Sequence, residues 1–131
     1  LTFNPANVSA VAGDTITFTF QSKNHSLTQS TFAAPCTKNG PVDSNFQFVS
    51  DATQLPTFVL NVTDTTPQWF FCAQTNPVSH CNMGMVFSVN ADPTSAKSFD
   101  AFQAAAKAAG SAPGGASQSG GASQSGGASQ S

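Results

Sequence analysis

The sequence predicts an all-β fold, a sandwich or barrel of short strands, and three observations support it. Apolar residues alternate with polar ones over several short runs, which is the pattern of strands with one buried face. Turn-forming residues separate these runs at 39–41, 64–67 and 76–77. Twelve phenylalanines, ten of them before residue 91, supply large side chains for a core between two sheets.

The clearest strand follows the Gly13-Asp14 turn, where Ile16, Phe18 and Phe20 alternate with threonines. Further strands are expected around Val8 and Val11, at Phe46 and Phe48, over 58–62, over 69–72, and from Met85 to Val89. Several short strands with regular turn signals between them are typical of a sandwich or a barrel.

A different period begins near Asp92. Residues 95–109 have an alanine-rich composition that predicts a helix, with Thr94 or Ser95 as its N-cap and Gly110 at its end. One face of this helix would carry the residues that dock it on the sandwich: Phe99, Phe102, Ala106 and Ala109.

The end of the chain repeats GGASQS three times, at 114–119, 120–125 and 126–131. This composition has no large apolar side chain to offset the entropy of ordering, so we expect a folded domain over 1–110 and a disordered tail over 111–131. The tail resembles the spacer that precedes a lipid anchor. We expect the chain to be a mature or trimmed segment of a secreted protein.

Charged residues make up only 8% of the chain, with formal net charge −2 and neither Glu nor Arg. Such a chain lacks the clustered cations that nucleic acid needs, so no nucleic-acid partner is expected. Its polar residues are Ser, Thr, Asn and Gln, which suits an extracellular protein. Three N-glycosylation sequons agree with that compartment, and their candidate residues are Asn7, Asn24 and Asn61.

Three cysteines leave one thiol after a single disulfide. Cys36 and Cys81 are favoured as the bridge, which leaves Cys72 free. Cys72 ends the apolar run 69–72 and would be either core filler or a shielded metal ligand. Such a bridge would draw the loop of His80 towards the loop that follows His25.

Cys72, His80 and Met85 follow one another closely, and His25 lies 47 residues before Cys72. Two imidazoles, a thiolate and a weak thioether are the donor set of a mononuclear blue-copper centre. Gly84 allows the turn that directs Met85 back towards the metal. Met83 is the competing thioether and is expected at the rim. The chemistry that follows is one-electron transfer without turnover of a substrate.

Three segments then resemble the cupredoxins, most of all the phytocyanin-like extracellular serine-rich proteins of fungi: NHSLTQSTFAAPC at 24–36, WFFCAQ at 69–74 and HCNMGMVFSVN at 80–90. The resemblance runs from about Asn4 to Phe102. It implies a Greek-key β-sandwich with one type 1 copper ion at one end. The polar composition, the sequons and the spacer-like tail predict that the protein is secreted, or held at the cell surface or wall, where a glycosylphosphatidylinositol (GPI) lipid would be the anchor. The resemblance further implies that the ligands are His25, Cys72, His80 and axial Met85, and that the disulfide joins Cys36 to Cys81.

Two features depart from the family pattern. Seven residues separate Cys72 from His80, a longer stretch than phytocyanins usually have, and Ser26 stands where many cupredoxins have an asparagine.

The expected partner is a redox protein or a small-molecule reductant, and the expected state is a monomer. A glycan at Asn24, beside His25, would shade the metal.

Two alternatives to electron transfer remain open: a non-redox surface module for adhesion or wall attachment, and a protein that captures or delivers copper. Three other interpretations fit less well. An oxidative polysaccharide-cleaving enzyme would need an N-terminal histidine, and residue 1 is Leu. A zinc site of Cys36, Cys72, His80 and Cys81 would leave His25 and Met85 without a role. Cysteine protease chemistry would need Cys72 at a helix start rather than in a strand.

Overall fold

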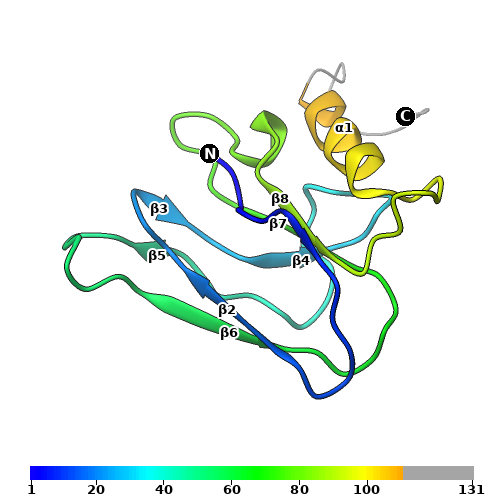
Figure 1. The fold of residues 1–131 in the computed structure, drawn as a ribbon. Coiled ribbons are helices and arrows are strands. Elements are labelled where there is room, and N and C mark those ends of the chain that lie inside the picture. Colours follow the sequence, from blue (N-terminus) through cyan, green and yellow to red (C-terminus); the bar gives the residue numbers. More distant parts are fainter. Residues whose placement is uncertain (111–131) are drawn as a thin grey trace.

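The computed structural model describes residues 1–110, whose strands form two layers (Figure 1). The first layer is a four-stranded sheet in the order β1-β8-β7-β4. Its strands are β1 (Asn7–Val8), β8 (Val86–Val89), β7 (Gln68–Phe71) and β4 (Thr28–Ser30). β1 runs parallel to β8, and the other neighbours are antiparallel. The first and the last strand of the sandwich therefore pair with each other in one sheet.

The second layer contains two antiparallel pairs. One joins β2 (Thr15–Thr19) to β6 (Thr57–Asn61), with Thr15 opposite Asn61 and Thr19 opposite Thr57. The other joins β3 (Asn24–His25) to β5 (Gln47–Phe48). The expected all-β sandwich is confirmed.

Alternation along β7 explains why both faces of the first sheet are buried. Phe70 points into the sandwich, where it joins a cluster with Leu27, Leu60 and Phe87. Trp69 and Phe71 point the other way and pack in a second cluster with Phe102 of the C-terminal helix. A strand buried on both faces reads as a continuous apolar run, as residues 69–72 do.

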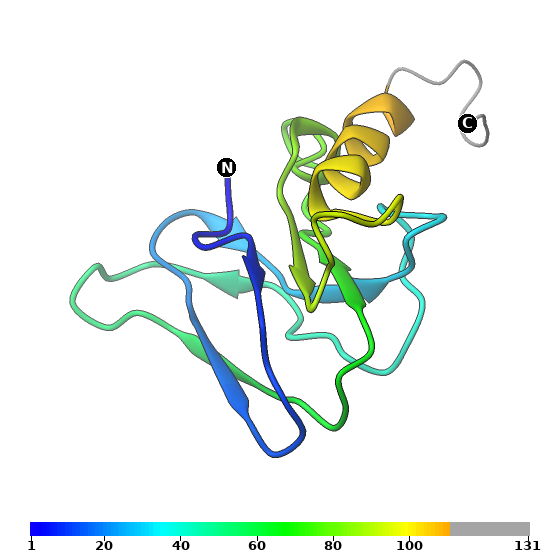
Figure 2. The ribbon, with the colours of Figure 1, turned by 45° about the vertical axis from the view of Figure 1, so that its right-hand side comes forward.

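The helix α1 (Phe99–Ala109) covers the outer face of the first sheet, on the side away from β2 and β6 (Figure 2). It begins later than predicted, because Ser98 is the N-cap and its hydroxyl accepts from the amide of Ala101. Thr94 and Ser95 do not cap it. The amide and hydroxyl of Thr94 instead donate to the carboxylate of Asp92, and the hydroxyl of Ser95 accepts from the amide of Lys97. Phe102 and Ala106 are buried as expected, whereas Ala109 is exposed.

Two expectations about the strands were wrong. Phe46 and Phe48 do not reach the core and are 51% and 65% exposed, because β5 has only two residues and Gln47 takes its inward side. Val11 is also exposed, since the first strand ends at Val8 and the chain then turns, with the Val11 amide donating to Asp14.

No helix within residues 1–110 has the length and apolarity needed to cross a membrane. The tail predicted from residue 111 onward lies outside the described residues.

Candidate metal centre

The three candidate ligands come from the ends of separate elements, which meet at one end of the sandwich. His25 is the last residue of β3, Cys72 directly follows β7, and His80 directly precedes the 3₁₀ turn η1 (Cys81–Met83). β4 follows β3 closely in the chain and pairs with β7, so this pairing places the segment of His25 beside the segment of Cys72. Residues far apart in the sequence are thereby placed side by side.

The side chains of His25, Cys72 and His80 converge on one point. The two Nδ1 atoms lie 3.1 Å apart, and the Cys72 Sγ lies 3.7 Å from the Nδ1 of His25 and 3.6 Å from that of His80. The point equidistant from these three atoms lies about 2.0 Å from each, close to the bond lengths that imidazole and thiolate ligands make with a first-row metal ion. The three residues could therefore hold a metal ion.

Burial and charge favour a metal over a proton at this site. His25, Cys72 and His80 are 7%, 0% and 4% exposed. Burial lowers the pKa of His25, and the nearby positive charge of His80 lowers it further. The pKa of His80 is also lowered, mainly by burial. Both imidazoles are thus neutral near pH 7, the state in which a ring nitrogen can coordinate.

The pKa of the Cys72 thiol is raised by its burial, and this effect is opposed by hydrogen bonds from the Gln74 and Ser26 amides. The Ser26 amide lies 3.4 Å from the sulfur. A buried thiol gives up its proton when a cation takes its place, because the metal charge offsets the cost of a buried anion.

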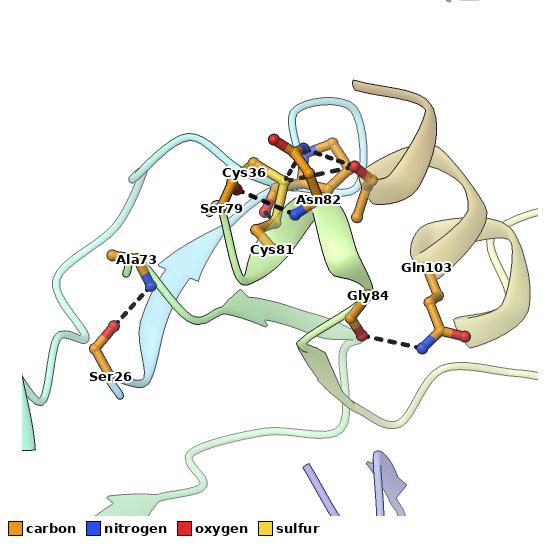
Figure 3. The surroundings of a disulfide bond; sticks show 10 residues. Ser26, Cys36, Ala73, Ser79, Cys81, Asn82, Gly84 and Gln103 are labelled. Carbon is orange, nitrogen blue, oxygen red and sulfur yellow. Dashed lines mark hydrogen bonds between the residues drawn. A yellow bond between two sulfur atoms is a disulfide. The ribbon is translucent and has the colours of Figure 1, made fainter. Parts of the chain in front are cut away.

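Ser26 joins the segment of His25 to the segment of Cys72. Its hydroxyl accepts from the Ala73 amide at 2.9 Å, a bond visible in Figure 3. It also lies 2.9 Å from the Thr28 hydroxyl, which donates to Asp43. Since Thr28 spends its only hydrogen on Asp43, Ser26 is the donor to Thr28. The Ser26 hydroxyl thus acts both as a donor and as an acceptor.

Gln74 connects the ligand loops in a way that sequence reasoning missed. Its carbonyl accepts from the His80 amide at 2.9 Å, and its side-chain amide donates to the Asn24 carbonyl at 3.4 Å. Its side-chain oxygen accepts from the amides of Thr75 and Asn76. One glutamine therefore bridges the segments of all three candidate ligands. A glutamine two positions after a cysteine carries no signal that would have identified it.

The disulfide and α1 hold the loop from His80 to Met85 from outside (Figure 3). Cys36 is bonded to Cys81, as expected. The side chain of Asn82 donates to the Ala106 carbonyl at 2.8 Å, and that of Gln103 donates to the Gly84 carbonyl at 3.0 Å. Gly84 has φ +102°, a backbone conformation that residues with a Cβ rarely adopt, so the turn favours glycine.

The two methionines differ sharply in position. Met85 is 4% exposed, while Met83 is 59% exposed. The Met85 amide donates to the His80 carbonyl at 3.0 Å, and its carbonyl accepts from the Cys72 amide at 3.1 Å. Met85 is therefore the buried thioether whose backbone touches two of the converging residues.

Comparisons with known proteins show what the chain resembles. No family model matches the chain. The sequence is 30% identical over 110 residues to a probable GPI-anchored cupredoxin-1 of Arthroderma benhamiae, an alignment that covers 84% of this chain and 55% of that protein. The chain thus spans about half the length of this relative. Among solved structures, a pseudoazurin from Sinorhizobium matches with a TM-score of 0.45 and 21% identity, over 68% of this chain and 59% of that one.

Proposed function

We propose that this cupredoxin-like chain binds one type 1 copper ion through His25, Cys72 and His80, with Met85 as the axial ligand, and serves in one-electron transfer. The observation that carries the proposal is the buried triangle of two imidazole nitrogens and one sulfur. When bound, copper supplies a one-electron couple that soft sulfur and borderline imidazole ligands tune between its two oxidation states.

The residues around the site stabilise the thiolate and hold the ligands in place. The Ser26 and Gln74 amides face the sulfur and stabilise its anionic form. The β4–β7 pairing and the disulfide fix the ligand positions, so little rearrangement accompanies a change of oxidation state. We infer that the chain turns over no substrate of its own and acts as a monomer that exchanges electrons with a redox protein or a small-molecule reductant.

The proposed location is the outside of the cell. The relative from Arthroderma benhamiae is named as GPI-anchored, and the sequons and low charge of this chain suit the same compartment. We therefore propose a secreted or cell-surface protein of fungal type, held by a lipid anchor in its processed form.

Titration with Cu(II), followed by visible absorption, tests the copper site. An intense blue thiolate-to-copper band should grow and saturate at one equivalent. Cys72→Ser should abolish it, and the matched control Met83→Leu, which changes an exposed thioether, should leave it intact. A colourless wild-type protein, or a band that survives in Cys72→Ser, would remove the proposed function.

A second candidate function is a surface-interaction module, and the exposed rings of Phe46 and Phe48 favour it. Phe48 pairs in register with Asn24, next to His25, so this apolar surface adjoins the metal site. If binding to a partner survives removal of copper and is lost in Phe46→Ser/Phe48→Ser, the module interpretation is supported. Copper capture is less favoured, because the burial of all three ligands opposes rapid release of the ion.

A further inference from the structure

Only one of the three sequons lies in surroundings that accept a sugar. We propose that Asn61 carries an N-linked oligosaccharide and that Asn7 and Asn24 do not. The inference uses the secretory route contained in the proposed function, but it does not depend on copper. It is carried by the hydrogen bonds and burial of the three asparagine side chains.

The chemistry sets the structural requirement. A lipid-pyrophosphate-linked oligosaccharide gives its sugar to the asparagine. A bond forms between Nδ2 and the anomeric carbon, the bond from that carbon to the phosphate oxygen breaks, and Nδ2 loses one proton. The product keeps the side-chain carbonyl and a single N–H. Transfer to a nascent chain precedes folding, so the folded protein must still leave room for the sugar at Nδ2.

Asn61 meets this requirement. It is the last residue of β6 and is exposed, and the next residue, Val62, is buried in the core. By alternation, Asn61 lies on the outer face of its strand together with the exposed Thr57 and Val59. Within residues 1–110 no hydrogen-bond partner occurs for its side-chain amide, so a sugar there displaces nothing.

Asn7 fails the requirement because its side chain is a structural clamp. Its Nδ2 donates to the Ala91 carbonyl at 3.2 Å. Its Oδ1 accepts from the Ser88 hydroxyl at 2.8 Å and from the Ala91 amide at 3.3 Å. These bonds join β1 to the segment after β8, 84 residues away. A sugar on Nδ2 would have to pass between Asn7 and the Ala91 carbonyl, and it would push the two segments apart.

Asn24 fails for a different reason. It is half-buried in β3, and its Oδ1 is buried without a hydrogen-bond partner among the described residues. The carbonyl half of the side chain therefore packs against the protein, which restricts the rotation that a sugar on Nδ2 would need.

The location of Asn61 has a consequence for access to the metal. Asn61 pairs with Thr15, at the start of β2, while the chain leaves the other end of β2 towards His25. Four residue steps along a strand span about 13 Å, so the sugar lies at the end of the β2–β6 pair away from the candidate ligands (Figure 1). Glycosylation at Asn61 would leave the copper site open.

Peptide mapping tests the assignment. The full chain is expressed behind a secretion signal in a eukaryotic host, then reduced, denatured and treated with peptide-N-glycosidase in heavy-oxygen water before digestion with trypsin. Cleavage after Lys23, Lys38 and Lys97 places the three sequons on separate peptides, 1–23, 24–38 and 39–97. The heavy label should appear only on 39–97, and a sample without the glycosidase gives the background from spontaneous deamidation.

Two variants make the result specific. Asn61→Gln and Thr63→Ala should each lose the label, and Thr63→Ala keeps the asparagine itself if Asn61→Gln should be poorly secreted. Label on 1–23 or 24–38, or no label on the secreted wild-type protein, would overturn the proposal. Copper binding is scored separately: the absorption band of Asn61→Gln should equal that of the wild type, so loss of the glycan and loss of the copper site give different results.

Discussion

Ser26 is the residue in which the two ligand-bearing segments meet. Its amide faces the Cys72 sulfur, and its hydroxyl accepts from Ala73 and donates to Thr28. Thr28 in turn donates to Asp43, which forms an ion pair with Lys38 at 3.0 Å. A directed chain of hydrogen bonds therefore runs from the edge of the metal site to the surface, and each member depends on the next.

Ser26→Ala should destabilise the protein by about 1–3 kcal/mol, because the half-buried amide of Ala73 loses its acceptor. Urea denaturation of the metal-free protein measures this change, and Ser22→Ala, on an exposed residue, is the matched control. The copper band should persist, since the Ser26 amide remains. Equal free energies of unfolding for Ser26→Ala and the wild type would show that this chain of hydrogen bonds does not contribute to stability.

The stability of the protein should depend on Asp43 at acid pH. Burial alone would raise the pKa of this carboxyl, but hydrogen bonds from Lys38, Asn45 and Thr28 and the charge of Lys38 together lower it from 3.8. A depressed pKa means that the stabilisation is complete above pH 3.8 and is lost as the pH falls through the lower, folded-state value.

Unfolding free energies measured from neutral pH down to below pH 3.8 therefore should fall less steeply for Asp43→Asn than for the wild type. The other lowered carboxyls, Asp51, Asp64 and Asp92, are retained in both proteins and cancel in the comparison. Identical pH slopes would contradict the role given to Asp43.

At the scale of elements, α1 acts as a clamp on the loop that carries His80 and Met85. Asn82 reaches the Ala106 carbonyl, and Gln103 reaches the Gly84 carbonyl from the helix side. The buried Phe102 and Ala106 fix the helix against β7 and β8. The position of Met85, which follows Gly84 directly, thus depends on a helix that supplies no ligand.

Gln103→Leu keeps the bulk of the side chain but removes the donor to Gly84. We expect a loss of stability of about 1 kcal/mol, together with a changed copper reduction potential as Met85 gains freedom. Potentiometric titration of the copper-loaded variant measures the second effect, and Ala104→Ser, at an exposed helix position, is the control. A wild-type potential in Gln103→Leu would show that the helix does not position Met85, the proposed axial ligand.

For the whole molecule, the disulfide ties the loop after β4 to η1 and closes a loop with sequence separation 45. On the chain-entropy model such a loop is worth roughly 3–4 kcal/mol. Cys36→Ala/Cys81→Ala should therefore unfold at clearly lower urea concentration than the wild type, whereas Cys72→Ser, which leaves the bridge intact, should not show the same loss. Equal unfolding midpoints of the double variant and the wild type would contradict this account.

The parts of the site that lie in short sequence motifs could be predicted. Cys72 and His80 are close in the chain, and the residue types alone indicated a metal. The disulfide and the sandwich also followed from cysteine count, strand pattern and resemblance. The helix start was missed because several hydroxyl residues precede α1, and only tertiary packing selects Ser98.

Other features could not be read from the sequence because they depend on contacts between distant segments. Gln74, Asp43 and Gln103 have ordinary surroundings in the chain and acquire their roles through partners in other loops. Phe46 and Phe48 follow the pattern of a buried strand, yet their short edge strand has no layer packed over that face. The alternation of apolar and polar residues identifies one face of a strand, but whether another layer covers that face depends on the whole fold.

Copper K-edge X-ray absorption of the copper-loaded protein tests the central claim most directly, because it reports the atoms bound to the ion. We predict one short copper–sulfur contact and two copper–nitrogen contacts near 2.0 Å, the radius of the triangle formed by residues 25, 72 and 80. A first shell of nitrogen and oxygen alone, unchanged between the wild type and Cys72→Ser, would contradict the account.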